Sequence, residues 1–429
     1  MQTVIWSELT EQEQQQLLTR APATCDPTLA ITVSAILAKV QHHGDKALAE
    51  LSQQFDGGLP EQWCLFASDI EVYAQQTPKA LQQAIDHALD NIERFHQAQQ
   101  QAHLTLDVQP GVRCEMHNEA IEKVGLYVPG GSAPLISTVL MLAKPAQLAG
   151  CRQQVLVTPP PLDPAIAYAA SRCEIERIVT IGGAQAIAAL AYGTETVPKV
   201  DKIFGPGSRF VTEAKQQVQQ QGIAIDMPAG PSEVLLIADQ WANPNFIAAD
   251  LLSQAEHGSD SQVILVTDSA TLAAQVAQAV AEQCAQLNRA EIANQALMHS
   301  SLIVADSIAQ AIAISNAYGP EHLIIQTEKP RQVLSQIRAA GSVFLGRWSP
   351  ESVGDYASGT NHVLPTYGAS RTVSSLSLAD FQRRFTVQEL TKSGLQSLSQ
   401  TVINLADAEG LGAHANAVRI RLESADDAL

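Results

Sequence analysis

Basic residues are scarce in this sequence of 429 residues. It holds 26 Lys and Arg against 44 Asp and Glu, so the formal net charge is −18 and the isoelectric point lies near 5.0. A field of this sign repels phosphate backbones and anionic lipid head groups. The charge balance therefore argues against nucleic acid and against a membrane surface as partners.

Long apolar runs are also missing. The first residues are acidic and lack the basic and apolar regions of an export signal, and no later stretch nears the roughly 18 unbroken apolar residues of a spanning helix. We therefore expect a cytoplasmic protein. The cysteines form no C-x-x-C pair and lack the spacing of a zinc-thiolate site, which favours reduced, structural thiols at Cys25, Cys64, Cys114, Cys151, Cys173 and Cys284.

The length predicts two to three domains at roughly 150 residues each, and 46% apolar residues supply material for their cores. Apolar side chains recur at steps of three and four in 29–55, which predicts a helix, and a second helix is expected at 78–102. Between 111 and 128 the pattern becomes extended and leads into a Tyr-Val-Pro-Gly-Gly turn at 127–131. We place a domain boundary near residue 126.

Strand and helix segments then alternate in two successive series. The first series runs to about residue 225 and the second from about 232 to 346. Such alternation builds parallel sheets covered by helices on both faces, so the expected fold class is α/β with two doubly wound units. After about residue 377 we expect only a helical tail. It is too small for a core of its own and would pack on another body, such as a second copy of the chain.

Polar residues suited to metal binding or proton transfer lie at or just after element ends in four places. Open α/β sheets bind ligands outside the carboxyl ends of their strands, which makes such positions informative. Gln254 and His257 are one helical turn apart, so an amide and an imidazole share one face. Glu321 and His322 are adjacent, and a carboxylate beside an imidazole suits general acid/base catalysis near neutral pH. Each motif alone also fits an ordinary polar helix end or a capped turn.

The other two places are glycine-rich. Asp355 is the one acid in the loop 352–362, and Glu409 and His414 are separated by glycines within the tail. Four of these side chains offer nitrogen and oxygen donors without sulfur, a set suited to zinc or another divalent ion: Gln254, His257, Asp355 and His414. Their spacing alone leaves this metal set unproved.

Two glycine turns could seat a phosphate group at the start of a helix. They are Gly182-Gly183 and the Gly-Pro-Gly sequence at 205–207. No complete G-x-G-x-x-G sequence accompanies them, so either turn alone is more often structural than cofactor-binding.

At these motifs the sequence resembles the histidinol dehydrogenase family. The resemblance runs from roughly residue 25 to 421. It is carried by LYVPGG, TIGGAQA, KIFGPG, DMPAGPSEVL, LLSQAEHG, YGPEHL, VGDYASGTNHVLPT and AEGLGAHANAVRIR, of which the last five are far more specific than a glycine turn.

The resemblance implies a homodimeric zinc enzyme that uses NAD twice, oxidising L-histidinol to the aldehyde and then to L-histidine. Glu321 and His322 match the catalytic pair: His322 is the general base, and Glu321 activates water for the second oxidation. The implied zinc ligands are Gln254, His257 and Asp355 from one subunit and His414 from the other. The implied substrate contacts are Ser232, Glu409, His322 and the zinc ligands, and the NAD contacts are Tyr127, Gln185 and Ser208.

One position departs from the family pattern. The family usually has Asn after GPG, where this chain has Ser208, a shorter hydrogen-bonding group. The resemblance also implies that the doubly wound units are incomplete Rossmann-like folds. We divide the chain into a short N-terminal segment, a discontinuous α/β domain with the metal and catalytic residues, a second α/β domain with NAD contacts, and a helical tail on the partner subunit: 1–23, 24–126 with 234–376, 127–233, and 377–429.

Two other enzyme classes remain open. A metal-dependent hydrolase could use a metal and an adjacent Glu-His pair, but it would not reduce NAD. An NAD-dependent dehydrogenase of another amino or sulfonated alcohol could share the metal site and the base. Ser232, Glu409 and His414 favour histidinol, because they match the pattern for a substrate with an imidazole and an amine.

Overall fold

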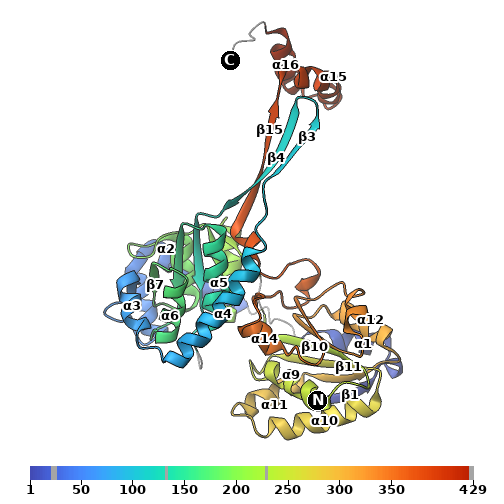
Figure 1. Cartoon of the computed structure of the whole chain (residues 1–429). Coiled ribbons are helices and arrows are strands. Elements are labelled where there is room, and N and C mark those ends of the chain that lie inside the picture. The colour runs from blue at the N-terminus through green and yellow to red at the C-terminus, as the bar shows by residue number, and fades with distance from the viewer. Residues whose placement is uncertain (21–26, 131–133, 228–229, 425–429) are drawn as a thin grey trace. The chain divides into compact units, whose positions relative to one another are not determined.

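A computed structural model describes residues 1–20, 27–130, 134–227 and 230–424 (Figure 1). Cys25 and Gly131, which the sequence analysis names, lie outside the described residues. The chain forms two compact units. Unit 1 comprises Met1–Gln99 and Ile121–Phe381, and unit 2 comprises Gln100–Ala120 and Gln382–Leu429.

Unit 1 contains two six-stranded sheets. The first sheet has the order β2-β7-β6-β5-β8-β9. All of its pairings are parallel except that of β2 with β7. Its strands are β2 (Cys64–Phe66), β5 (Lys123–Tyr127), β6 (Gln153–Val157), β7 (Arg177–Val179), β8 (Lys202–Phe204) and β9 (Ala224–Ile225).

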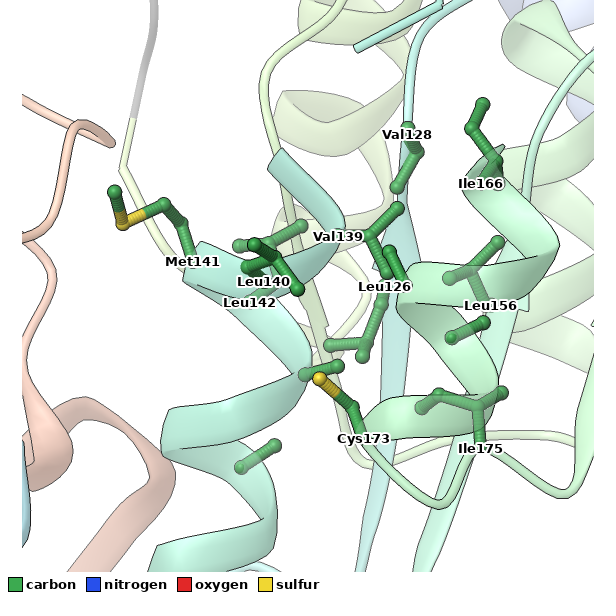
Figure 2. Packing of buried hydrophobic residues seen from close by; sticks show 14 of the residues in the cluster. Leu126, Val128, Val139, Leu140, Met141, Leu142, Leu156, Ile166, Cys173 and Ile175 are labelled. Carbon is green, nitrogen blue, oxygen red and sulfur yellow. The ribbon is translucent and has the colours of Figure 1, made fainter. Parts of the chain in front are cut away.

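Helices cover both faces of the first sheet, because its strands are apolar on both sides. One buried cluster joins the sheet to α3 (Ala67–Ala74), α4 (Lys79–Gln97), α5 (Ile136–Ala149) and α6 (Pro164–Arg172). Figure 2 shows part of this cluster, in which Val139 of α5 and Leu126 of β5 are fully buried. A second cluster joins the opposite face to α2 (Pro27–Phe55), α7 (Gly183–Tyr192) and α8 (Arg209–Gln220).

The second sheet is entirely parallel, in the order β1-β12-β11-β10-β13-β14. Its strands are β1 (Gln2–Ile5), β10 (Glu233–Ala238), β11 (Gln262–Thr267), β12 (Ser301–Val304), β13 (His322–Gln326) and β14 (Ser342–Leu345). The accompanying helices are α1 (Glu11–Leu18), α9 (Pro244–Ala255), α10 (Ala270–Cys284), α11 (Ala290–Met298), α12 (Ile308–Tyr318), α13 (Pro330–Leu334) and α14 (Glu351–Tyr356).

Unit 2 is built from two distant parts of the chain. Its antiparallel sheet has the order β15-β4-β3, with β3 (Leu104–Gln109), β4 (Val112–Ala120) and β15 (Gln382–Leu390). Two helices, α15 (Lys392–Ala408) and α16 (Gly412–Glu423), follow β15. The Thr391 side chain accepts a hydrogen bond from the backbone N–H of Gly394 and so caps α15.

The predicted α/β class with parallel sheets and covering helices is confirmed. Three details of the predicted division differ from the strands observed. The predicted division assigns 24–126 to the same domain as 234–376. In the structure, β2 and β5 of this segment instead belong to the first sheet, together with the strands of 127–233. The N-terminal segment supplies β1 to the second sheet, and the tail 377–429 contains the strand β15. All three depend on pairing with remote strands, which local periodicity does not report.

Candidate active site

Glu321 and His322 lie where α12 passes into β13. The helix ends at Gly319, whose φ of +64° is a left-handed conformation that glycine adopts without strain, and His322 is the first residue of β13. The pair therefore lies at the amino end of this strand. Open α/β sheets bind ligands outside the carboxyl ends of their strands, so this pair lies at the opposite end of β13 from that edge.

The backbone of Glu233 holds both members of the pair. Its N–H donates to Oε2 of Glu321 at 2.8 Å, and its carbonyl oxygen lies 3.1 Å from Nδ1 of His322. A carbonyl oxygen only accepts, so the proton of this contact is on Nδ1 and a neutral ring carries its lone pair on Nε2. That Nε2 is buried and has no hydrogen-bond partner among the residues that the structure describes. The arrangement fixes one nitrogen of His322 and leaves the other as the nitrogen that gains or loses the ring's second proton.

The carboxylate of Glu233 is held in turn by a residue from the N-terminal segment. Arg20 donates through Nε at 2.5 Å and through a terminal nitrogen at 2.7 Å, and it places its guanidinium over the Tyr318 ring. The exposed fractions of the two side chains are 13% for Arg20 and 3% for Glu233. A bidentate pair with so little exposure fixes the strand end that positions Glu321 and His322.

Acidic groups surround His322. Its Nε2 lies 3.6 Å from Oδ1 of Asp355, and ligand atoms of His322, Glu351 and Asp355 all lie within 4.8 Å of one another. Burial alone would lower the pKa of His322, but Glu351, Glu321 and Asp355 outweigh it and raise the pKa to about 10. Burial raises the pKa of Glu321 to about 8 and also raises that of Glu351.

Such a buried acidic cluster suits a divalent cation. The acidic groups around His322 repel one another, and they favour the protonated imidazole because its positive charge reduces that repulsion. A metal cation could supply the same positive charge in place of the proton. The fully buried amide of Gln254 faces the Glu351 carboxylate; with its nitrogen toward Glu351, its oxygen accepts from the Glu233 N–H at 3.2 Å. With its oxygen toward Glu351, the same amide adds a donor for a cation.

His257 belongs to the same neighbourhood. It follows the end of α9 and interacts electrostatically with Asp355 and His322. The residue is exposed, although the protein packed around its ring lowers its pKa. A lowered pKa keeps the imidazole neutral, which is the form that binds metals. Gln254, His257 and Asp355, the three same-subunit ligands expected from the sequence, are thus gathered around His322.

Sequence reasoning missed Glu351, which is 1% exposed. A signal was present, because Glu351 and Asp355 are four residues apart in α14 and such residues share a helix face. It also missed Arg20 and the backbone role of Glu233. Neither had a local signal, since each acts through a contact with a segment far away in the sequence.

The expected NAD contacts lie at the carboxyl ends of strands in the first sheet. Tyr127 ends β5, and its hydroxyl accepts from the Gly183 N–H at 3.2 Å. Gln185, in the first turn of α7, donates to Oδ2 of Asp56 at 3.1 Å, a partner that sequence reasoning missed. Ser208 is the exposed residue that precedes α8, and its side chain makes no capping hydrogen bond.

Comparison with known proteins places these features in one family. The family model described as histidinol dehydrogenase matches residues 19–422. Histidinol dehydrogenase of Vibrio cholerae serotype O1 is 56% identical over 425 residues, and that of Shewanella oneidensis is 58% identical over 435, each match covering 99% of both chains. The chain belongs to the histidinol dehydrogenase family.

A solved structure agrees with this assignment. The crystal structure of histidinol dehydrogenase from Elizabethkingia anophelis is 47% identical, covers 99% of this chain and 98% of that chain, and superimposes with a TM-score of 0.95. Membership of the histidinol dehydrogenase family makes the chain an NAD-dependent oxidoreductase of histidine biosynthesis, as predicted. The resemblance inferred from the sequence motifs is confirmed.

The remaining expected site residues of this histidinol dehydrogenase family member lie on the two units. Ser232 directly precedes β10, and its carbonyl oxygen accepts from the Gln262 N–H at 3.2 Å. Glu409 directly follows α15 and His414 lies in the first turn of α16, so both belong to unit 2, where both are exposed. Their part in the site remains a prediction.

The cysteines stay apart from this chemistry. The five cysteines that the structure describes are free thiols, and three of them, Cys151, Cys173 and Cys284, are buried. Burial raises the pKa of Cys173 to about 12, which makes it inert as a nucleophile.

In the described parts of the chain, no helix has both the length and the apolar character required to cross a membrane.

Proposed function

We propose that the chain oxidises L-histidinol to L-histidine through the aldehyde, with reduction of two NAD. The observation that carries this proposal is the position of His322. Its Nδ1 is fixed on the Glu233 carbonyl, and its unpartnered Nε2 faces Asp355. A cation bound among the surrounding carboxylates would favour the neutral ring. In that form, placed at the substrate hydroxyl, Nε2 can take the alcohol proton in the first oxidation and the proton of the hydrated aldehyde in the second.

Glu321 prepares the second oxidation in this proposal. Its Oε2 is held by the Glu233 N–H at 2.8 Å, and burial raises its pKa to about 8, above the usual range of a carboxylate. A base with a pKa close to neutral can take a proton from water and so help to hydrate the aldehyde. No thiol is needed for this step. NAD, when bound, accepts the hydride in each oxidation.

We propose Zn²⁺, one per subunit, as the resident metal. Gln254, His257 and Asp355 would hold it together with His414 of the partner subunit. The amide, the acid and the exposed imidazole found beside His322 supply a suitable donor set. When bound, the zinc ion orients the substrate and stabilises negative charge on its oxygen.

The substrate contacts follow from the same set. We infer that Ser232, His322 and the metal ligands meet the substrate from one subunit, and that Glu409 and His414 of the partner subunit meet it from the other. Glu409 and His414 are exposed on unit 2, whose two helices bury few side chains, and contact with the partner's substrate would give these residues a function. This arrangement requires a homodimer.

For NAD we propose contacts with Tyr127, Gln185 and Ser208. All three follow strands of the first sheet at its carboxyl edge, and the strand order reverses there between β5 and β8. Doubly wound sheets bind nucleotides at such a reversal. Ser208 replaces the usual Asn with a shorter side chain, so its contact would be weaker. We place this reaction in the cytoplasm.

A direct spectrophotometric assay tests the function. Purified chain is incubated with NAD and L-histidinol while the absorbance of reduced nicotinamide is followed. We expect two NAD reduced per histidinol consumed and L-histidine as product. A metal-dependent hydrolase would form no reduced nicotinamide, and a dehydrogenase of another amino or sulfonated alcohol would prefer that alcohol over histidinol by kcat/KM. Either result would refute the proposal.

A further inference from the structure

The two sheets of unit 1 share one strand order, although only the second is entirely parallel. In the first sheet β5 lies between β6 and β8, and in the second sheet β10 lies between β11 and β13. In both, the strand order reverses beside this central strand, which creates the crevice where doubly wound sheets take their ligands. The first sheet carries its proposed NAD contacts at this crevice. The proposed catalytic pair of the second sheet lies at the opposite, amino end of β13.

The second sheet has a pocket at its own strand reversal. This pocket, which we call the β13-edge pocket, has a volume of about 530 Å³ and is lined by residues that follow β10, β13 and β14. Its lining includes Trp241, Gln326, Thr327, Glu328, Arg347 and Trp348. It therefore occupies the position at which the topology predicts a ligand, on a sheet whose catalytic residues lie elsewhere.

Two tryptophans give the β13-edge pocket aromatic walls. Trp241 is 64% exposed and Trp348 is 80% exposed, unusual for the largest apolar side chain. The Trp348 ring lies 5.9 Å from that of Phe246, which leaves much of its surface open. Exposed indole faces stack well on flat heteroaromatic rings such as nucleobases.

Gln326, which lines the β13-edge pocket, has a buried acceptor that lacks a partner among the described residues. Gln326 is only 4% exposed, and its Nε2 donates to Oδ2 of Asp250 at 2.8 Å. Its Oε1 is buried and unpartnered, and so is Oγ1 of Thr327. Buried polar atoms without partners are costly in a folded protein. With its nitrogen engaged, the Gln326 amide can recognise only a donor, such as the amino group of adenine or cytosine.

Arg347 supplies a positive charge to the β13-edge pocket. Arg347 lines the pocket and forms no ion pair with any other residue in the described ranges. A guanidinium pairs readily with phosphate oxygens. Glu328, the acid in the lining, would disfavour a ligand that carries several negative charges close to it. The combination favours a flat ring with an amino group and a single phosphate.

We propose that the β13-edge pocket binds a nucleoside monophosphate with an amino-substituted base. The base stacks on Trp348 and Trp241, its amino group donates to Oε1 of Gln326, and its phosphate pairs with Arg347. This site is separate from the proposed NAD contacts at Tyr127 and Gln185, and it stands whether or not the proposed reaction is correct.

Calorimetric titration of the full chain with adenosine 5′-monophosphate tests the proposal. Saturating NAD is present throughout to fill the dinucleotide site. We expect one further saturable site. Trp348→Ala should weaken it by roughly 5- to 150-fold, as loss of one stacked base does, whereas Trp348→Phe should retain most of the affinity.

Two further comparisons address the polar contacts. Purine riboside 5′-monophosphate, which lacks the amino group, should bind about tenfold more weakly than adenosine 5′-monophosphate, and ribose 5-phosphate should not bind measurably. Gln326→Leu should abolish the difference between the two nucleotides, with circular dichroism to verify its fold. If the fold is lost, the ligand comparison on the wild-type chain still decides.

Several outcomes would overturn the proposal. They are the absence of a second site under saturating NAD, affinity unchanged in Trp348→Ala, and equal affinity for the two nucleotides. A change of molar mass in Trp348→Ala, without nucleotide binding by the wild-type chain, would show instead that the tryptophans form an interface between copies of the chain.

Discussion

Nδ1 of His322 lies 3.1 Å from the carbonyl oxygen of Glu233, which makes Nε2 the nitrogen that accepts a proton when the ring is neutral. Replacing His322 with Asn removes this ring nitrogen and keeps a smaller polar side chain. We expect turnover to fall by roughly 10²- to 10⁴-fold, the usual loss for a general base, with zinc content unchanged. Steady-state rates and metal analysis of the same preparation measure both. Unchanged turnover would remove His322 from the mechanism.

Two donor sets for the metal can be separated by substitution. In the proposed set His257 is a ligand, whereas the cluster within 4.8 Å contains His322, Glu351 and Asp355. We expect His257→Ala to lose bound metal and activity together, because a three-ligand remnant binds zinc weakly. His322→Asn is the matched control and should keep its metal. Metal lost from His322→Asn but kept in His257→Ala would favour the second set.

Sharing of the site between subunits has its own test. His322→Asn and His414→Ala chains, each with little activity alone, are mixed and allowed to exchange subunits. If His414 serves the partner's site, half of the sites in a mixed dimer combine a wild-type His322 with a wild-type His414, while the other half carry both substitutions. Verified mixed dimers should then regain close to half of the wild-type activity per dimer. No regain would indicate sites built within one chain.

The Arg20–Glu233 pair should matter for stability and for catalysis. Its side chains are 13% and 3% exposed, so Arg20→Met leaves a buried carboxylate unpaired, and we expect unfolding free energy to drop by about 3–5 kcal/mol. Urea unfolding measures this. Arg172→Met, which breaks the much more exposed pair with Asp86, is the control and should cost under about 1 kcal/mol.

The same pair should also affect the proposed reaction, because the backbone of Glu233 holds Glu321 and His322. Under conditions where Arg20→Met stays folded, we expect kcat to fall more than KM changes and the pH profile of kcat/KM to shift. Arg20→Lys should restore part of both. A destabilised variant with an unaltered pH profile and kcat would limit the pair to a structural role.

Asp250 predicts how stability depends on pH. Burial raises its pKa to about 7, against about 3.9 in an unfolded chain, so the folded state binds the extra proton between these values. Its contribution is therefore complete below about pH 4 and is lost as the pH rises to about 7. Relative to wild type, Asp250→Asn should gain roughly 2 to 3 kcal/mol between pH 5 and pH 7. Urea unfolding with a chelator present checks this, and a difference independent of pH would contradict it.

Local patterns predicted the regular parts of the fold well. Apolar periodicity and turn residues located α2 and the series of strands from β10 to β14, because strands buried on both faces read as continuous apolar runs. The strand β15 escaped this reasoning. Its sequence QRRFTVQEL is largely polar and exposed, and it becomes a strand by pairing with β4, far away in the chain.

The candidate site was predictable to the extent that its residues sit in distinctive motifs. Gln254, His257, Asp355 and His322 were found in this way, and the structure brings them together. The residues that position them, Arg20 and Glu233, were not found from the sequence. They are more than two hundred residues apart in the chain and come into contact only in the folded structure. Sequence motifs identify side chains with suitable chemistry. The residues that position those side chains are identified only by contacts in the tertiary structure.

The pairing of β15 with β4 also imposes an order of events during synthesis. Ala120 and Gln382 are paired neighbours, although 262 residues separate them (382 − 120). At about 5–20 residues per second, the hairpin of β3 and β4 waits roughly 13 to 52 seconds on the ribosome before its third strand emerges. Throughout that interval β4 offers an open edge to other nascent chains, so unit 2 must be the last part to mature and the step most exposed to mispairing.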